Sequence, residues 1–353
     1  MQQATVGGVM GAAGLFEIYS RNTRTRVMTD TTSKPEPAAM PMWMKIVVFY
    51  GRFAPSFTAV GYVARGLPLR PLQASFKGQT WLVTGATGGI GRGIALGAAQ
   101  RGATVLAVGR NEAALKALAQ AGGAGIVPLQ FDLELVAANL ALADEVLRRG
   151  GKLDVLVNNI GKLDHAHRLT PEGFEGTYAL NLLGHFALTE KLITAGALDG
   201  GAVINMASGG LYNTALTLRR LELKPDRYSG VMAYAAHKRA QLALAGRWTQ
   251  PDRRLVSYTM HPGWVATQGV STALPDLERH LGFVLRTPAQ GADTALWLAA
   301  KRPAPVPGAL WFDRAPRAAH AYAFSRTPEV EPEAVYAKLL ADVAKVGSAD
   351  ASA

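Results

Sequence analysis

The stretch TGATGGIG, from Thr84 to Gly91, decides the fold. A short apolar run at residues 81–83 precedes it, and a helix-like stretch at residues 92–100 follows it. Glycine lets a chain turn sharply and approach phosphate oxygens, and the N-terminus of the next helix offers unpaired N–H groups. The order strand, glycine loop, helix therefore predicts a binding site for the pyrophosphate of a dinucleotide. A tight turn without a ligand is the alternative.

Strand-like and helix-like segments alternate from Gly78 onward. Short apolar runs bounded by Gly, Asn or Asp predict buried strands at residues 81–83, 104–108, 126–131, 155–157, 203–206, 255–260 and 310–312. Ala-rich and Leu-rich stretches of helical length lie between them at residues 92–100, 112–121, 138–149, 171–194 and 232–248. This alternation predicts an α/β fold: a single Rossmann-type doubly wound domain with a seven-stranded parallel sheet, plus an N-terminal extension.

The ends of the chain differ in composition from its middle. We expect an N-terminal extension over residues 1–75, the Rossmann domain over residues 76–320 and a C-terminal tail or helix over residues 321–353. Residues 1–41 are rich in Gly, Ala, Thr and Pro, which predicts a disordered tail. The apolar stretch at residues 46–64 is interrupted by charge and proline, so it falls short of a spanning helix. Contact with a membrane surface and packing as an arm on the domain both stay open.

Charge and residue content narrow the function classes. The net charge is +11, and residues 1–76 contribute +5 of it through eight Lys or Arg against three Asp or Glu. The remaining excess is mild and forms no basic stripe, so we expect no nucleic acid partner. The chain has no cysteine, which excludes disulfides and suits the reducing cytoplasm. The close pair His165 and His167 lacks a third ligand at helical spacing, so we expect no metal.

The end of the second predicted strand bears on the choice of dinucleotide. An acidic residue there accepts hydrogen bonds from the ribose 2′-hydroxyl of NAD(H) and repels the 2′-phosphate of NADP(H). This strand ends in Val108, Gly109 and Arg110, with no carboxylate. Because the guanidinium of Arg110 suits a phosphate, we expect NADP(H) to be preferred, with NAD(H) use still open. An ordinary solvated arginine is the other interpretation.

Tyr234 and Lys238 lie four residues apart in a helix-like stretch, which places them on one helix face. A free tyrosine has a pKa near ~10, and an opposite charge within a few Å lowers a pKa by roughly 1 to 3 units. We therefore expect the Lys238 ammonium to lower the pKa of Tyr234 and make it a proton donor to a carbonyl oxygen. Ser208 follows the fifth predicted strand, at the sheet edge where ligands bind.

Over about residues 78–312 the chain resembles the classical short-chain dehydrogenase/reductase (SDR) family. The motifs stand in the family's order: TGATGGIG, Asp132 with Leu133, NNIG at 158–161, NLLGHF at 181–186, INMAS ending at Ser208, YAAHK at 234–238, and HPGWVAT at 261–267. Within the family the chain looks most like the dehydrogenase/reductase member 12-like group, through SGG after Ser208, YAAHKRAQL, QGADTALWLA and WFDR at 311–314.

The resemblance implies roles for the matched residues. It implies cofactor contacts by Gly85, Thr87, Gly89, Ile90 and Gly91 in the glycine loop, by Asp132 and Leu133 at the adenine, by Asn158 on the adenosine ribose side, and by Pro262, Gly263 and Thr267 at the nicotinamide end. It implies a catalytic set in which Asn181 holds a water of a proton relay, Ser208 orients the substrate oxygen, Tyr234 is the acid or base, and Lys238 binds the nicotinamide ribose.

Two departures from the family pattern matter. The gap between serine and tyrosine is about twice the usual length, because residues 209–233 include an insert that could be a substrate lid or a surface loop. The insert also contains Tyr228, a competitor for the catalytic phenol, but Met232 stands where its lysine would be, so we favour Tyr234. The second departure is Ile160 in NNIG, where the family usually has alanine.

Together these features predict an NADP(H)-dependent oxidoreductase that interconverts a carbonyl and an alcohol. The apolar insert and the Leu-rich region after Thr267 suggest a hydrophobic small-molecule substrate. A catalytically idle dinucleotide-binding sensor or interaction protein is the alternative. Neither the substrate nor the oligomeric state follows from the sequence.

Overall fold

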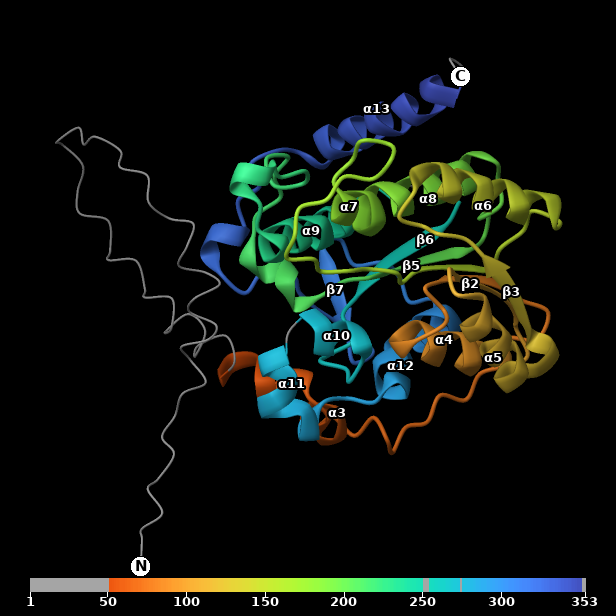
Figure 1. Cartoon of the computed structure of the whole chain (residues 1–353). Helices are drawn as coiled ribbons and strands as arrows, with labels where there is room; N and C mark the ends of the chain where they lie inside the picture. Colours follow the sequence, from red (N-terminus) through yellow and green to blue (C-terminus); the bar gives the residue numbers. More distant parts are fainter. Residues whose placement is uncertain (1–50, 250–253, 274, 351–353) are drawn as a thin grey trace, which may run out of the picture.

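A twisted sheet of eight strands forms the centre of the molecule (Figure 1). The computed structural model describes residues 51–249, 254–273 and 275–350, so the predicted tail over residues 1–41 lies outside the described residues. The strand order is β3-β2-β1-β4-β5-β6-β7-β8. The strands are β1 (Thr80–Thr84), β2 (Thr104–Gly109), β3 (Ile126–Gln130), β4 (Val155–Asn158), β5 (Ala202–Met206), β6 (Val256–Met260), β7 (Ala309–Phe312) and β8 (Ala315–Ala318).

Strands β1 to β7 are parallel, which confirms the prediction of a Rossmann-type doubly wound domain with seven parallel strands. An eighth strand, β8, pairs antiparallel with β7 and did not follow from the sequence. Asp313 and Arg314 form the turn between them with φ of 50° and 60°, the backbone that two-residue hairpins favour. The sequence of β8 is APRA, and its proline and exposed side chains give no apolar strand pattern.

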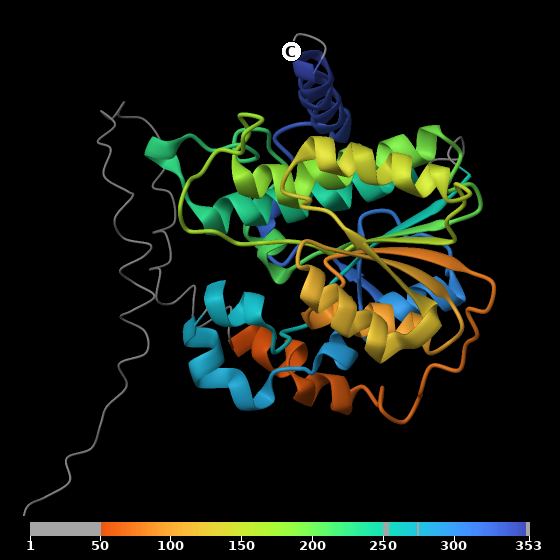
Figure 2. The same ribbon diagram turned by 45° about the vertical axis from the view of Figure 1, so that its right-hand side comes forward.

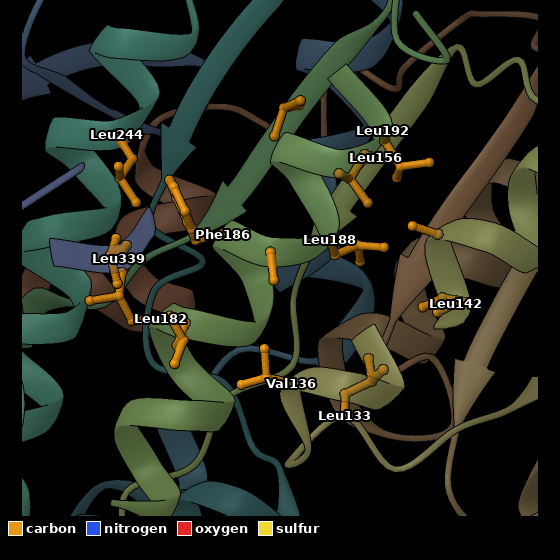
Figure 3. Packing of buried hydrophobic residues seen from close by; sticks show 14 of the residues in the cluster. Leu133, Val136, Leu142, Leu156, Leu182, Phe186, Leu188, Leu192, Leu244 and Leu339 are labelled. Atoms are coloured by element: carbon orange, nitrogen blue, oxygen red, sulfur yellow. The ribbon is translucent and has the colours of Figure 1, made fainter. Parts of the chain in front are cut away.

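Helices cover both faces of the sheet (Figures 1 and 2). One face carries α6 (Val136–Arg148), α8 (Gly184–Thr194) and α9 (Gly230–Trp248), with α13 (Pro332–Asp350) packed outside them. The other face carries α4 (Gly89–Ala99), α5 (Glu112–Gly122) and α12 (Pro288–Lys301). Each face has its own apolar core, and Figure 3 shows the first, in which Leu142, Phe186 and Leu244 from three helices meet Leu156 of the sheet.

The predicted helix over residues 171–194 begins later than expected. It consists of α7 (Gly176–Tyr178), a π-helical turn η2 (Ala179–Leu183) and α8, in direct succession. The helix begins after Glu175 because the Glu175 carboxylate accepts hydrogen bonds from the backbone N–H groups of Thr177 and Tyr178 and so caps the helix N-terminus. The π-helical turn is an irregularity that often marks a functional site.

The described part of the N-terminal extension packs on the domain. Residues 51–57 are helical and are followed by α3 (Ala59–Ala64). Phe53 and Phe57 are buried, and their rings stack at 4.8 Å, with Phe53 also stacked at 5.3 Å on Tyr212 of the insert. Val60 and Val63 point outward and are more than half exposed. No helix in the described ranges is both long and apolar enough to cross a bilayer.

The insert after Ser208 contributes its apolar side chains to the fold. It contains the short helices η3 (Gly209–Asn213) and η4 (Pro225–Arg227). Leu211, Leu216 and Leu221 are buried. The buried guanidinium of Arg239 on α9 donates to the carbonyl oxygens of Leu211, Thr214 and Ala319, and so joins the insert to the C-terminal segment. Most apolar surface of the insert is therefore used internally.

Candidate active site

The glycine loop lies between β1 and α4, where the strand order reverses from β1 to β4. Such a switch point is where open parallel sheets bind ligands. Gly85 and Gly89 have φ of 64° and 50°, which side-chain-bearing residues rarely adopt. A Cβ atom at Gly91 would overlap the carbonyl oxygen of Gly85. The loop therefore needs glycine at these positions to keep its backbone close to the helix N-terminus.

Strand β4 holds the glycine loop from the other side of the switch point. The Thr84 hydroxyl donates to the Val157 carbonyl oxygen and accepts from the backbone N–H groups of Asn159 and Ile160. The Asn159 side-chain amide donates to the carbonyl oxygens of Thr84, at 2.8 Å, and Gly85, at 3.3 Å. Sequence reasoning missed Asn159 as a site residue, although it stands inside the NNIG motif that we singled out.

Two predicted cofactor residues are Thr87, inside the loop, and Arg110, after β2. The Thr87 methyl group lies 2.6 Å from where a Cβ of Gly109 would be, so the loop contacts the end of β2 directly. Arg110 comes next and is exposed; in the described part of the chain its guanidinium makes no hydrogen bond or ion pair. Its side chain is thus available beside the loop.

The loop also meets the HPGWVAT segment. The Thr267 methyl group lies 2.9 Å from where a Cβ of Gly89 would be. Ile90 packs beside Gly291 on α12, near Val265. Pro262 and Gly263 lie over the buried side chain of Arg286, which leaves no room for a Cβ at Gly263, where φ is 81°. The structure therefore brings the HPGWVAT segment next to the glycine loop.

The structure places two predicted cofactor side chains elsewhere. Leu133 is buried in the apolar core (Figure 3), so its side chain is not presented to an adenine. Asn158 is fully buried, and its amide nitrogen donates to Thr189 and Asn205 between sheet and helix. Tertiary packing thus turns both side chains inward, and the predicted cofactor contacts of Leu133 and Asn158 would have to come from their backbone atoms. Asp132, in contrast, is exposed.

Three of the four predicted catalytic residues meet beside the end of β5. The Lys238 ammonium nitrogen lies 5.5 Å from the centre of the Tyr234 ring, and both residues are on α9. Ser208 shares a hydrogen bond with the Tyr234 phenol. A Cβ at Gly210 would lie 3.6 Å from Tyr234 Cδ1 and 3.7 Å from Ser208 Oγ, so the turn after Ser208 packs closely against the phenol ring.

The electrostatics of this pair differ from our expectation. Burial raises the pKa of Tyr234, and only the hydrogen bond with Ser208 lowers it. Burial lowers the pKa of Lys238 to about 7. The expected lowering of the Tyr234 pKa by Lys238 is therefore absent in this arrangement, in which the lysine donates to other groups. These are the Met206 carbonyl oxygen, at 2.7 Å, and the Gln241 side-chain oxygen, at 3.1 Å.

Asn181, the fourth predicted catalytic residue, lies in the π-helical turn η2. Its side-chain oxygen accepts from the Lys162 N–H and its side-chain nitrogen donates to the Lys162 carbonyl oxygen. A Cβ at Gly161 would be 3.4 Å from both Asn181 Oδ1 and Lys238 Nζ. Asn181 and Lys238 thus converge on Gly161, at the end of the NNIG motif.

The competing phenol, Tyr228, has a different setting. Its hydroxyl donates to the Asp164 carbonyl oxygen and the Glu175 carboxylate, each at 3.2 Å. Burial raises its pKa to about 12. Tyr228 thus joins the insert to the loop before α7, away from Ser208 and Lys238.

The N-terminal arm reaches this site, which the sequence did not indicate. The Phe57 ring lies 4.3 Å from the ring of His261. Phe57 also lies 3.0 Å from where a Cβ of Gly209 would be. The buried guanidinium of Arg286 fixes this contact, since it donates to the Phe57 carbonyl oxygen and pairs with Asp313 at 2.6 Å and 2.9 Å. Within the described ranges no group of three His, Asp or Glu could hold a metal ion.

A doubly wound sheet with a glycine loop at its switch point, and a tyrosine, lysine and serine beside an adjacent strand end, defines an α/β nucleotide-binding oxidoreductase. Residues 79–217 match the family model described as short chain dehydrogenase. The chain belongs to the short-chain dehydrogenase/reductase family, whose members act on alcohol and carbonyl groups and bind NAD(H) or NADP(H).

Individual relatives agree with this assignment. Dehydrogenase/reductase SDR family member 12 of Homo sapiens is 33% identical over 287 residues, covering 78% of this chain and 89% of that protein. Retinol dehydrogenase 14 of Mus musculus is 30% identical over 246 residues, covering 63% of this chain and 73% of that protein. A crystal structure from Beutenbergia cavernae, described as a "putative NAD(P) dependent gluconate 5-dehydrogenase" with bound NADP at low occupancy, is 28% identical, with a TM-score of 0.54 over 68% of this chain and 96% of that one. The predicted resemblance to the member 12-like group is confirmed.

Proposed function

We propose that the protein is an NADP(H)-dependent oxidoreductase that interconverts a carbonyl and an alcohol on a hydrophobic substrate, with Tyr234 as the general acid or base. The observation that carries the proposal is the meeting of Tyr234, Ser208 and Lys238 beside the end of β5, the neighbour of the strand β4 that holds the glycine loop. The reducing cytoplasm is the compartment that we propose, since the chain has no cysteine.

The residues present fit a nicotinamide dinucleotide. Gly85, Gly89 and Gly91 keep Cβ atoms out of the loop where a pyrophosphate would approach the N-terminus of α4. Arg110, exposed and without a partner in the described residues, would meet the 2′-phosphate of NADP(H). Lys238 has three N–H groups and uses two of them, so the third can donate to a ribose hydroxyl.

Side chains of the protein carry out the proton transfer. When bound, the reduced cofactor supplies a hydride to the carbonyl carbon. Tyr234 then gives its hydroxyl proton to the carbonyl oxygen, so that the substrate becomes an alcohol and the tyrosinate later takes a proton from solvent. Ser208 donates a hydrogen bond to the same oxygen and stabilises the charge that develops on it. In the reverse direction the phenolate removes the alcohol proton.

Two features support a hydrophobic substrate. Phe57 packs beside Gly209, the residue after Ser208, and its ring lies 4.3 Å from that of His261 and 5.7 Å from that of Trp264. Retinol dehydrogenase 14, one of the relatives, is named for an apolar alcohol. The substrate itself is a question for the assay.

A panel of apolar aldehydes, ketones and quinones with NADPH or NADH tests the proposal. We expect turnover with NADPH, and a fall of roughly 10²- to 10⁴-fold in kcat for Tyr234→Phe, since that change removes the proton donor. Tyr228→Phe is the matched control: it removes a half-buried phenolic hydroxyl from the insert that precedes Tyr234 and should keep most of the activity.

Cofactor binding separates the two function classes. If the protein binds NADPH tightly but turns over no substrate of the panel, and Tyr234→Phe changes nothing, the idle sensor is the better description. If NADH and NADPH bind equally well, the role of Arg110 is wrong while the oxidoreductase proposal stands.

A further inference from the structure

The Lys238 ammonium is held by two oxygen atoms inside the protein. One is the Met206 carbonyl oxygen at the end of β5, 2.7 Å away, and the other is the Gln241 side-chain oxygen, 3.1 Å away. Lys238 is only 2% exposed, so these two acceptors replace water as its partners. A buried ammonium depends on such acceptors, because burial without them disfavours its charged form.

The Gln241 amide can adopt only one orientation here. Its nitrogen donates to the Asn181 carbonyl oxygen at 2.7 Å and bonds His185 Nδ1 at 2.8 Å. An amide nitrogen has two donor hydrogens, and both are used by these partners. Turning the amide over would set its NH₂ group against the Lys238 ammonium and its oxygen against the Asn181 carbonyl oxygen. The amide oxygen must therefore face Lys238.

The two partners of the Gln241 nitrogen come from two successive helical elements. Asn181 lies in the π-helical turn η2 and His185 in the following helix α8. Asn181 takes part through its backbone carbonyl oxygen, and His185, Lys238 and Gln241 take part through side chains; all four residues are buried. A buried network whose members are mutually hydrogen-bonded resists rotation of any one of them.

We propose that Gln241 is a positioning residue of the reaction: its amide fixes the Lys238 ammonium and joins it directly to the Asn181 turn. This inference rests on the proposed function. It also gives Asn181 a contact that the sequence did not predict, since the Gln241 amide donates to its carbonyl oxygen. Unlike water, an amide does not readily transfer a proton. Gln241 therefore acts on Lys238 by fixing the position of the ammonium group and by stabilising its positive charge.

The other titratable groups near Lys238 are neutral at physiological pH. Burial, and to a smaller extent the positive charge of Lys238, lowers the pKa of His185 on α8 to about 3 and that of His237 on α9 to about 4. Burial raises the pKa of Tyr234, which also stays uncharged. Glu175 acts on His237 from the start of α7. In the described residues, the polar atoms that contact the ammonium are thus the Met206 and Gln241 oxygens.

Two substitutions with opposite expected effects on the pKa of Lys238 test the inference in the full-length protein. Gln241→Leu removes an acceptor from the ammonium, so we expect the pKa of Lys238 to fall by about 1–2 units and kcat to fall by up to about 100-fold, with KM for the carbonyl substrate nearly unchanged. Gln241→Glu places a carboxylate there, so the pKa of Lys238 should rise by roughly 1–3 units. The loss of activity at high pH should move in the same direction as each pKa.

Gln290→Leu is the matched control, because it removes a Gln side chain from the capping box of α12, away from Lys238. It should alter neither kcat nor the Lys238 titration. The pKa of Lys238 is measured by ¹³C NMR of labelled lysine Cε atoms, with Lys238→Met to assign the signal, and thermal melting checks that each variant folds.

The two proposals fail separately. A folded Gln241→Leu protein with the parental kcat, pH profile and Lys238 titration would overturn the role of Gln241. If the parent reduces no carbonyl, the proposed function fails, while the NMR titrations of Gln241→Leu and Gln241→Glu still decide whether Gln241 controls Lys238. Loss of activity with an unchanged Lys238 titration would show a purely structural role and also overturn the inference.

Discussion

The buried ion pair between Arg286 and Asp313 allows the sharpest test of how the N-terminal arm is joined to the catalytic domain. The side chains are 1% and 2% exposed, and two hydrogen bonds of 2.6 Å and 2.9 Å connect them. Arg65 of the arm donates to the same carboxylate at 2.6 Å. Arg286 also donates to carbonyl oxygens of the arm, those of Ser56, Phe57 and Thr58, and to that of Pro262.

Asp313→Asn removes the carboxylate and leaves the shape of the side chain. Asparagine tolerates the left-handed backbone at this position, where φ is 50°, so backbone strain should not contribute. The Arg286 guanidinium would then stay buried without an opposite charge, which typically costs about 3–5 kcal/mol. For a domain of this size that corresponds to a fall in melting temperature of roughly 6–20 °C.

Urea unfolding followed by circular dichroism measures this loss. Glu112→Gln is the control, since it breaks an ion pair with Lys116 in which both side chains are more than 60% exposed, and such pairs contribute little. The double variant Arg286→Met with Asp313→Asn should regain part of the stability, because no buried charge remains. The reasoning is refuted if Asp313→Asn is as stable as Glu112→Gln.

Three further predictions concern the cofactor loop and the lysine. Gly91→Ala should abolish NADPH binding in a fluorescence titration, because the added methyl group overlaps the Gly85 carbonyl oxygen; unchanged affinity contradicts the loop geometry. Arg110→Asp should weaken NADPH binding by at least about tenfold relative to NADH, since it exchanges a phosphate partner for a repelling charge; equal effects on both cofactors would exclude a 2′-phosphate contact. Burial lowers the pKa of Lys238 from 10.5 to about 7, so between these values the unfolded chain binds a proton that the folded chain lacks, and stability should rise with pH by up to about 1.4 kcal/mol per unit. Urea unfolding at pH 7, 8 and 9 should show a smaller rise for Lys238→Met than for the parent.

The parts of the fold that follow from the sequence are those with a local signal. The apolar runs between Gly, Asn and Asp predicted all seven parallel strands, because strands buried on both faces must be apolar throughout. The glycine loop was evident because its glycines serve a backbone need that other residues cannot meet. The hairpin to β8 had no such signal, since an exposed edge strand needs no apolar pattern.

The parts that the sequence did not yield depend on which way side chains turn. The motifs that contain Leu133 and Asn158 were assigned to the cofactor, but packing against α6 and α8 turns both side chains into the interior. Gln241 and Phe57 are the opposite case. Phe57 belongs to no motif that we quoted, and Gln241 stands in YAAHKRAQL but received no role there. Only the tertiary structure brings Gln241 to Lys238 and Phe57 to His261.

The protonation state of Tyr234 bears on the direction of the proposed reaction. Because burial raises its pKa, the phenol keeps its proton at neutral pH, which is the form that a carbonyl reduction requires. A phenol with a raised pKa is also a weaker acid. The placement of the phenol beside the carbonyl oxygen must therefore contribute more to the rate of proton donation than the acidity of the phenol does. Before substrate binds, the hydrogen bond with Ser208 lowers the pKa of Tyr234 and offsets part of the effect of burial. Alcohol oxidation needs the phenolate at the outset, and it should therefore require a higher pH than carbonyl reduction does.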